Sequence, residues 1–455
     1  MKQKALLAIV IAILLIMLLG CLPTPKHEAV VNKSDGLMEK RIKAQAVQEY
    51  AFEHNDSWQE KIQLQKVAIL FDASIETPQT LKYPVLTIKK SSFTPDRVLS
   101  IVNALYPGNN MIRVNDYSVD EIEFDMRMVQ RGQYEDYNDE TDEIIWAPYE
   151  DESEQMNYLA NLLREAPQED IFVPFSVGSI KMDGTQMVIK TETGKVLYLF
   201  AKPQMIRIGA SRNGDIQPES LVWSTGGFAG ETRHALDNVI ITDEEIEIQT
   251  SEMLDRLGLN KDFSIASSEK ARILEYIPEG FSILSEGRLI ELGRTAGVYS
   301  PYNYESYGAD NSLRIAGSDE LQYAPKWDCD TIQFYMDENG LQTFAWYYPN
   351  EIVMTANENV ELLSFAEVKQ SIRDLLQYSY AWTDDAAAVT FHEIHVKKLI
   401  LSCAIAQIPN QGKEAFLIPT WIVVYSNDRN ESRHHKDSIL LINAIDGSYI
   451  NRFIG

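Results

Sequence analysis

Residues 191–206 read TETGKVLYLFAKPQMI, and residues 336–352 read MDENGLQTFAWYYPNEI. These two stretches form an internal repeat with an offset of 146 residues, and in both a glycine precedes a proline by nine residues. Between the glycine and the proline, aromatic side chains recur at alternate positions, which is typical of a strand with one buried face. The repeat therefore predicts two hairpins, each with a glycine in its turn and a second strand that ends at the proline.

Signals for the start of a helix follow both hairpins. Thr242 with Glu245, and Ser364 with Glu367, match the capping box that opens many helices. Thr94 supplies a further start, because a proline and an aspartate come directly after it. Each predicted helix is amphipathic and must pack on a sheet. The sequence thus predicts an α+β fold, with antiparallel sheets that carry helices on one face and are built from repeated hairpin–helix units.

Strand-like segments are spread over the whole chain. They are rich in β-branched and aromatic residues and are bounded by Gly, Pro, Asn and Asp. The eight predicted strands cover residues 66–74, 83–89, 186–190, 195–200, 331–336, 341–347, 416–425 and 438–442. A length of 455 residues suits two to four domains. We expect an N-terminal α+β lobe at residues 60–330 and a C-terminal lobe at residues 331–455.

The N-terminus has the features of a secretory leader. Lys2 and Lys4 precede an uncharged apolar run at residues 5–19, which is shorter than the roughly 20 residues of a membrane-spanning helix. The run ends in Leu-Leu-Gly before Cys21, which resembles the lipobox of bacterial lipoproteins. The resemblance implies a signal peptide at residues 1–20, an acylated Cys21, and attachment to the extracytoplasmic face of the cell membrane. Residues 21–59 are then a lipidated tether with a short helix; the alternative is an uncleaved membrane anchor.

The charge of the chain excludes one large class of partners. Lys and Arg number 41 against 67 Asp and Glu, so the formal net charge is −26. A protein so acidic is not a nucleic-acid binder of the basic type. Apart from Cys21 the chain has two cysteines, Cys329 and Cys403, and the sequence leaves open whether they pair.

The C-terminal lobe carries motifs that point to a family. Residues 417–421 read LIPTW, and residues 443–447 read NAIDG at a turn between two predicted strands. This combination resembles the PepSY-like units of extracytoplasmic bacterial proteins and the YycH/YycI type of regulatory proteins. With Phe71-Asp72-Ala73, Phe93-Thr94-Pro95 and the predicted hairpin that starts at Arg131, the whole mature chain resembles an uncharacterised lipoprotein family of low-GC Gram-positive anaerobes. The resemblance implies a lipid-anchored, two-lobed α+β protein without a known reaction.

Motifs of catalysis are weak in this chain. The sequence contains no G-x-S-x-G, no P-loop and no H-E-x-x-H. Ser267 and Lys270 match S-x-x-K but lack the partner motifs of penicillin-binding enzymes, so we expect a short surface helix there. His392 and His395 lie in a segment with strand character, where residues three apart face opposite sides. We therefore expect no metal site, no cofactor and no enzymatic activity.

An acidic segment lies in the first lobe. Residues 135–154 contain ten Asp and Glu, but threonine stands at the position where an EF-hand loop needs glycine. We expect residues 134–146 to form an acidic hairpin, and weak Ca²⁺ binding is the alternative.

Aromatic residues supply the candidate binding site. Tyr299, Tyr302, Tyr304 and Tyr307 fall within nine residues, and Trp223 lies in a glycine-rich segment. Tyrosines in exposed loops are typical of surfaces that stack on sugars or contact proteins. The alternative is a packed loop between lobes.

These features favour a non-catalytic, lipid-anchored binding or regulatory protein of the cell envelope. It would engage an envelope protein or peptide through a sheet edge or the tyrosine-rich loop. One alternative is a carbohydrate- or peptidoglycan-binding lipoprotein. Another is an envelope hydrolase with carboxylates that are dispersed in the sequence.

Overall fold

The described chain consists mainly of β-strands. The computed structural model describes residues 36–115, 117–130, 134–138, 143–147, 152–211, 221–224, 239–277, 280–295, 299, 330–385, 392–407, 414–427 and 437–450. Within these residues, two large sheets of eight and ten strands carry most of the chain, with a separate two-stranded hairpin and six α-helices. The prediction of an α+β fold of repeated hairpin–helix units is therefore wrong.

The chain separates into two compact units, and neither is continuous in sequence. Unit 1 comprises Met1–Lys89, Ala296–Asp328 and Glu351–Gly455, and unit 2 comprises Lys90–Thr295 and Cys329–Asn350. This division differs from the expected lobes at residues 60–330 and 331–455. The segment around the second repeat belongs with the middle of the chain, whereas the N-terminal strands belong with the C-terminal ones.

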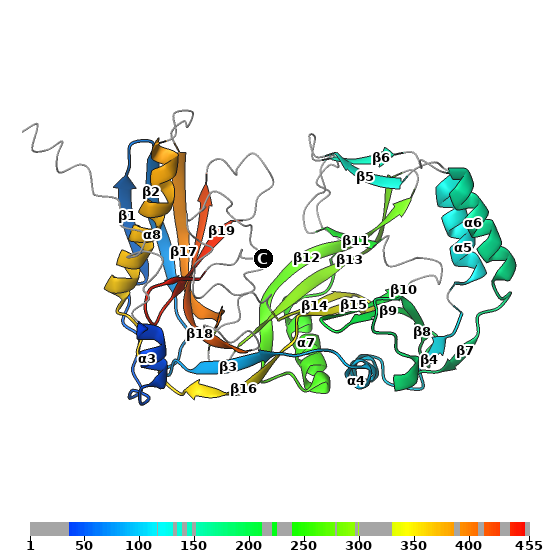
Figure 1. Cartoon of the computed structure of the whole chain (residues 1–455), viewed down its shortest axis with the longest axis horizontal. Coiled ribbons are helices and arrows are strands. Elements are labelled where there is room, and N and C mark those ends of the chain that lie inside the picture. Colours follow the sequence, from blue (N-terminus) through cyan, green and yellow to red (C-terminus); the bar gives the residue numbers. More distant parts are fainter. Residues whose placement is uncertain are drawn as a thin grey trace, which may run out of the picture. The chain divides into compact units, whose positions relative to one another are not determined.

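Unit 1 is built on the eight-stranded sheet (Figure 1). Its elements are α3 (Leu37–Lys43), β1 (Ser57–Gln63), β2 (Val67–Glu76), β3 (Val85–Lys90), β16 (Asn350–Asn357), α8 (Phe365–Asp385), β17 (His392–Gln407), β18 (Glu414–Asn427), β19 (Ser438–Asn443) and β20 (Tyr449–Ile450). The strand order is β1-β2-β17-β18-β19-β20, and β3 joins β18 to β16. Strands β2 and β17 are parallel, so the N-terminal and C-terminal parts of the chain share one sheet.

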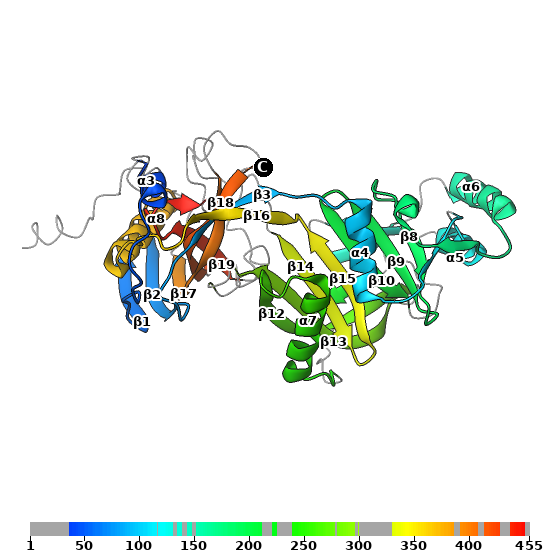
Figure 2. The same cartoon turned by 90° about the horizontal axis from the view of Figure 1, so that it is seen from below.

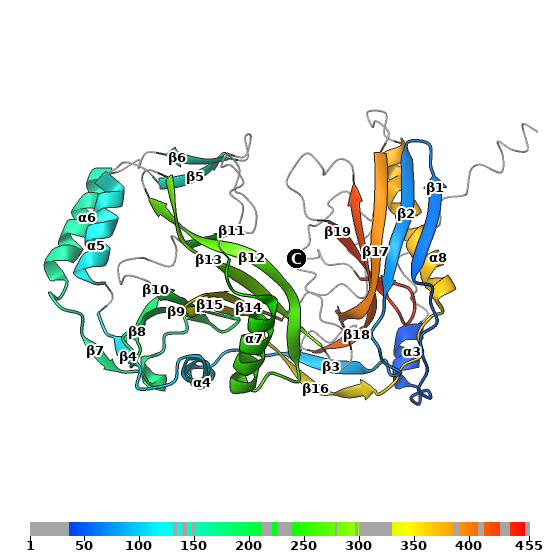
Figure 3. The same cartoon turned by 180° about the vertical axis from the view of Figure 1, so that it is seen from behind.

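Helix α8 covers one face of this sheet (Figures 1 and 3). The predicted capping box is confirmed, because Ser364 and Glu367 bond reciprocally at its first turn. The apolar stripe of α8 is buried, and Phe365 at its start packs against Trp421 of β18 with the rings tilted by 42° and their centroids 5.6 Å apart. Phe52 approaches the same Trp421 ring at 5.6 Å. The LIPTW motif therefore supplies a core tryptophan.

Unit 2 is built on the ten-stranded sheet, with strand order β11-β12-β13-β14-β15-β10-β9-β8-β4-β7 (Figure 2). Its elements are α4 (Pro95–Leu105), β4 (Met111–Arg113), α5 (Val119–Gln130), β5 (Tyr134–Asn138), β6 (Glu143–Ala147), α6 (Glu152–Glu165), β7 (Phe172–Pro174), a 3₁₀ turn (Val177–Ser179), β8 (Met187–Lys190), β9 (Val196–Lys202), β10 (Met205–Ser211), β11 (Leu221–Ser224), α7 (Asp243–Leu257), β12 (Phe263–Ile277), β13 (Gly280–Arg294), β14 (Thr331–Asp337) and β15 (Gly340–Tyr347). Helices α4 and α7 pack on one face of the sheet and complete its apolar core.

The two repeat copies are hairpins, as predicted. Strands β8 and β9 pair across a turn in which Gly194 has φ 84°, and β14 pairs with β15 across Gly340 at φ 86°. Strand β10 pairs with both β9 and β15, so the two hairpins belong to one sheet. The helices after the copies diverge, because α7 packs in unit 2 and α8 packs in unit 1. A hairpin with its following helix is therefore not a structural unit here.

Helices α5 and α6 form an arm that follows β4 and precedes β7 in the chain, while β4 and β7 pair directly with each other in the sheet (Figure 1). They share a small core in which Ile122, Val129 and Leu159 are buried. Strands β5 and β6 pair with each other, which confirms the predicted acidic hairpin. Within the described part of the chain, no helix is long and apolar enough to cross a membrane.

Candidate functional site

Most of the predicted site residues fall outside the described residues. This applies to the lipidation residue Cys21, to Tyr302, Tyr304 and Tyr307, and to Cys329, whose pairing with Cys403 stays open. Tyr299 is described and is buried, and its hydroxyl donates a hydrogen bond of 3.0 Å to the Pro84 carbonyl. Burial raises its pKa well above the usual value. Tyr299 therefore packs inside unit 1 and does not present its ring to a ligand.

Trp223 lies on β11, at the end of the ten-stranded sheet, where it pairs with Ile273 of β12. It belongs to unit 2, whereas Tyr299 belongs to unit 1. The structure thus places these two candidate residues in different units. The prediction had grouped them as binding residues only because both are aromatic.

The weak catalytic motifs both lie on strands. Ser267 and Lys270 are part of β12, so the expected surface helix is wrong, and two residues three apart on a strand face opposite sides. Ser267 donates instead to a Glu291 carboxylate oxygen at 3.3 Å. The strand prediction for His392 and His395 is confirmed, because both lie on β17. Among the described residues, no group of His, Cys, Asp and Glu is arranged to hold a metal ion.

Buried carboxylates test the hydrolase alternative. Four are buried among the residues whose side chains are described, namely Glu121, Asp330, Asp337 and Asp446. Glu121 pairs with Arg113 at 2.7 Å, and Asp337 accepts from the Gln342 amide at 2.9 Å. Asp446 accepts from the Ser448 backbone at 2.8 Å inside the NAIDG turn. Each of these three carboxylates is thus bonded to a neighbouring group of the fold. The Asp330 carboxylate accepts hydrogen bonds from Trp346 and Asn350.

Strand β16 presents an exposed apolar edge. Among the described strands it pairs with β3 alone, so its other edge has no strand beside it. Three consecutive apolar residues of this strand are exposed: Ile352 at 37%, Val353 at 46% and Met354 at 58%. Neighbouring residues of a strand point to opposite sides, so the strand is apolar and accessible on both faces. Proteins usually protect such an edge with charge, proline or a covering loop.

The start of β16 is held firmly in unit 2. The Asn350 backbone N–H donates to the Asp330 carboxylate at 3.0 Å, and the Trp346 indole N–H donates to the same group at 2.6 Å. Arg294 adds a hydrogen bond to this carboxylate at 3.2 Å. Burial raises the pKa of Asp330, and the Arg294 guanidinium opposes that effect. The first residue of β16, Asn350, is therefore held in place by the Asp330 carboxylate.

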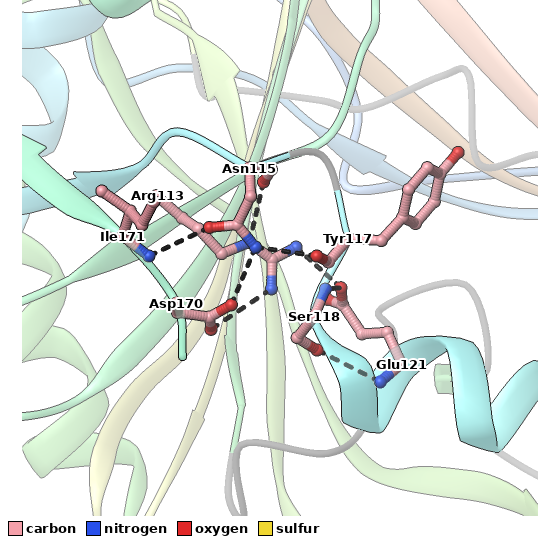
Figure 4. Close-up of polar contacts among 7 residues, drawn as sticks. All are labelled: Arg113, Asn115, Tyr117, Ser118, Glu121, Asp170 and Ile171. Atoms are coloured by element: carbon pink, nitrogen blue, oxygen red, sulfur yellow. Dashed lines mark hydrogen bonds and ion pairs between the residues drawn. The ribbon is translucent and has the colours of Figure 1, made fainter. Parts of the chain in front are cut away.

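A second polar network lies at the base of the arm (Figure 4). The buried Arg113 guanidinium lies 2.7 Å from Glu121 at the start of α5 and 3.6 Å from Asp170, which precedes β7. Asn115 donates to Asp170 at 2.9 Å and accepts from the Ile171 backbone N–H at 3.1 Å. Ser118 and Glu121 also cap α5 reciprocally. The network ties both ends of the arm to the sheet.

Neither feature was predicted from the sequence. The segment 350–357 contains Ile, Val and Thr, which is a strand signal, but the repeat predicts a strand that ends at Pro349. The network of Arg113 joins residues up to 57 positions apart in the chain, and no local pattern marks such a set.

Comparison with known proteins yields little. No family model matches the chain, and no curated protein matches it. Among solved structures, the chain is similar to the crystal structure of an uncharacterised protein from Eubacterium rectale. The two share 12% sequence identity and a TM-score of 0.42, over 92% of this chain and 99% of that one.

Proposed function

We propose that this chain is a lipid-anchored binding protein on the extracytoplasmic face of the cell membrane. It binds an extended segment of an envelope polypeptide along the edge of β16. It has no catalytic activity of its own. The observation that carries the proposal is the run of three exposed apolar residues, Ile352–Met354, on a strand whose outer edge lacks a strand partner in the described chain.

The anchor follows from the N-terminal sequence. A positive start, an apolar run of about 15 residues and a cysteine after Leu-Leu-Gly are the features that direct lipidation of Cys21. Two or more acyl chains give stable attachment, whereas one gives marginal attachment. The resemblance to PepSY-like and YycH/YycI-type proteins supports the same location and a regulatory role.

Strand addition explains why such an edge is useful. An extended segment that pairs with β16 gains main-chain hydrogen bonds, and its alternate side chains contact the apolar residues on either face. Because Val353 is flanked by two apolar neighbours, an incoming strand finds an apolar contact on both of its faces.

Charge selects the chemistry of the partner. The chain carries a net charge of −26, so two copies repel each other and a cationic segment is attracted. Close to the strand, Glu351 pairs with Lys89 at 2.8 Å and both are half-exposed. We therefore expect an extended segment in which Lys or Arg alternates with apolar residues.

A peptide titration tests this proposal. The full-length protein in neutral detergent is titrated into a fluorescein-labelled peptide of alternating Lys and Val, and anisotropy is recorded. Val353→Lys places a charge on the edge, and we expect at least a tenfold loss of affinity, which corresponds to about 1.4 kcal/mol. Ile248→Lys is the matched control, because Ile248 is 53% exposed on α7 and belongs to unit 2.

A second control uses the peptide itself. The same peptide with N-methylated backbone amides keeps its charge and side chains but cannot pair as a strand, and it should bind at least tenfold more weakly. Equal binding by the methylated peptide, or by the Val353→Lys variant, would remove β16 as the binding site.

A further inference from the structure

Strand β10 carries an arginine on the face of the ten-stranded sheet that α4 and α7 do not cover. Ile206 and Ile208 of β10 pack in the apolar core with these helices, so Arg207 between them points to the opposite face. Arg207 is exposed, and within the described chain its side chain forms no hydrogen bond or ion pair. A guanidinium on an inner strand of the sheet is therefore free to bind a ligand.

Arginines elsewhere in this acidic chain are commonly paired. The sequence holds 67 Asp and Glu against 41 Lys and Arg, so carboxylates are plentiful. Ion pairs are formed by Arg41, Arg113, Arg272, Arg288, Arg294 and Arg373. Arg207 has no such carboxylate among the described residues, and the pairing register of the sheet explains why.

The neighbours of Arg207 directly across and along the strands carry no charge. Phe200 of β9 and Ala345 of β15 are directly opposite Arg207, and directly opposed residues share a face. Met205 and Gly209 lie two positions before and after it on β10 and share this face as well. Because Ala345 and Gly209 are small, the sheet itself places few side-chain atoms beside the guanidinium.

The diagonal neighbours of Arg207 add a second cation and aromatic rings but no acid. They lie about 7–8 Å away between Cα atoms, and they are Tyr198 and Lys202 of β9 and Thr343 and Tyr347 of β15. The Lys202 ammonium lies 5.1 Å from the centroid of the Phe200 ring. Burial raises the pKa of the Tyr347 phenol, and the positive charge of Arg207 lowers it. The surroundings of Arg207 on this face are therefore cationic and aromatic.

Thr343 supplies a second donor without a partner. Its hydroxyl is buried and has no hydrogen-bond partner among the described residues, and the residue as a whole is 7% exposed. Buried polar groups are nearly always hydrogen-bonded, so this hydroxyl indicates a missing acceptor. Since Thr343 and Arg207 are diagonal neighbours on one face, a ligand group with two acceptor oxygens can contact both donors.

We propose that Arg207 and Thr343 bind the carboxylate of a small organic acid that has an aromatic or apolar body. The Arg207 guanidinium pairs with the carboxylate, the Thr343 hydroxyl donates to one of its oxygens, and the body contacts the Phe200 and Tyr347 rings. One guanidinium balances the single charge of a carboxylate, whereas a phosphate monoester carries close to two negative charges. The site lies in unit 2 and is independent of the proposed function of β16.

Fluorine NMR of a labelled acid tests the proposal. The full-length protein in neutral detergent is titrated into 4-fluorophenylacetate, and 4-fluorophenylacetamide serves as the neutral probe of the same shape. We expect the acid to bind at least tenfold more tightly than the amide, and Arg207→Gln to lose at least tenfold of the affinity for the acid. Arg256→Gln is the matched control and should leave this affinity unchanged, because Arg256 is exposed on α7 and bonds to the backbone of its own helix.

Thr343→Val separates binding from stability. The substitution keeps the shape of the side chain and removes the hydroxyl, so the acid should bind at least threefold more weakly. The midpoint of urea denaturation should stay the same or rise, because the hydroxyl has no hydrogen bond to lose within the described fold. A lower midpoint would show that the fold already uses this hydroxyl and would remove Thr343 from the site.

Three outcomes would overturn the proposal as a whole. Equal binding of acid and amide, or no binding of either, would show that the carboxylate is not recognised. An unchanged affinity of Arg207→Gln for the acid would place the acid elsewhere on the protein. Displacement of the bound acid by inorganic phosphate at a lower concentration than by acetate would assign the site to phosphate groups.

Discussion

At the scale of single residues, Tyr106 at the end of α4 is a buried tyrosine whose hydroxyl finds no hydrogen-bond partner among the described residues. Burial raises its pKa above the usual value of 10. An unsatisfied buried hydroxyl costs about 1–3 kcal/mol. Tyr106→Phe should therefore leave the free energy of unfolding unchanged or raise it by about 1 kcal/mol, as measured by urea denaturation.

Tyr335 on β14 provides the matched control in the same unit. Its hydroxyl is fully buried and donates to the Ser285 carbonyl at 3.1 Å. Tyr335→Phe leaves that carbonyl without this donor and should cost about 1–2 kcal/mol. Equal effects of the two substitutions would contradict the assignment of Tyr106 as the unsatisfied hydroxyl.

Asp330 makes stability depend on pH in a direction that is unusual for a carboxylate. Burial is the largest influence on its pKa and raises it above the ordinary value of 3.8, while Arg294 and the donors from Trp346 and Asn350 lower it. A second carboxylate, Asp262, lies 3.8 Å from Arg294. A raised pKa in the folded state means that the folded chain holds the proton more tightly than the unfolded chain does.

The sign of the effect follows from this difference. The stability that Asp330 contributes by titration is fully present below pH 3.8 and is lost as the pH rises through its folded-state pKa. The free energy of unfolding of the natural chain minus that of Asp330→Asn should therefore fall as the pH rises above 3.8. Urea denaturation at each pH measures it. If this difference in the free energy of unfolding grows with pH instead, Arg294 lowers the pKa of Asp330 by more than burial raises it.

At the scale of elements, the arm depends on one buried cation. Arg113→Ala removes the guanidinium and leaves the Glu121 carboxylate buried without its ion pair, which typically costs about 3–5 kcal/mol. Amide protons of α5 and α6 should then exchange at least 100-fold faster, while those of β9 and β15 in the same sheet keep their rates. Hydrogen exchange with mass spectrometry reads both regions.

An arginine on α6 serves as the control for this change. Arg164 is exposed and contacts its own helix, so Arg164→Ala should alter exchange in the arm by less than about threefold. Slow exchange of α5 in Arg113→Ala would mean that the small core of the arm holds it without the network.

Strands and helix caps could be predicted from the sequence wherever a short, continuous pattern of residues marks them. All eight predicted strands are confirmed, as are the start of α4 at Thr94 and the boxes of α7 and α8. The long pair β12 and β13 was missed, because it is rich in Ser, Glu, Arg and Gly and lacks a continuous alternation. Helix α3 (Leu37–Lys43) lies within residues 21–59, where a short helix was expected.

At the scale of the whole molecule, the proposed lipidation of Cys21 predicts where the protein resides. Cys21→Ala removes the thiol that the proposal assigns to the lipid, so the chain should no longer be labelled by palmitate. The natural chain, expressed in a Gram-positive host, should be labelled and should sediment with membranes. Cell fractionation with metabolic labelling measures both. An unlabelled natural chain that still sediments would support the uncleaved anchor instead.

The assembly of the elements could not be predicted because it depends on long-range pairing. The repeat correctly predicts two hairpins, but β10 joins them into one sheet, and no local pattern states this. Parallel pairing of β2 with β17 joins strands more than 300 residues apart in the chain. For the same reason the sequence left open whether the tyrosine cluster is an exposed binding loop or a packed loop, and the structure buries Tyr299 against the segment before β3.

The central claim is that a cationic extended segment pairs with the outer edge of β16. Hydrogen exchange of the backbone amides of Glu351–Thr355 in the full-length protein, with and without a saturating peptide of alternating Lys and Val, tests this claim most directly. The account predicts that the amides that face outward from β16 exchange at least tenfold more slowly with the peptide, and that the N-methylated peptide has no such effect. Peptide binding without any slowing in β16 would contradict the claim.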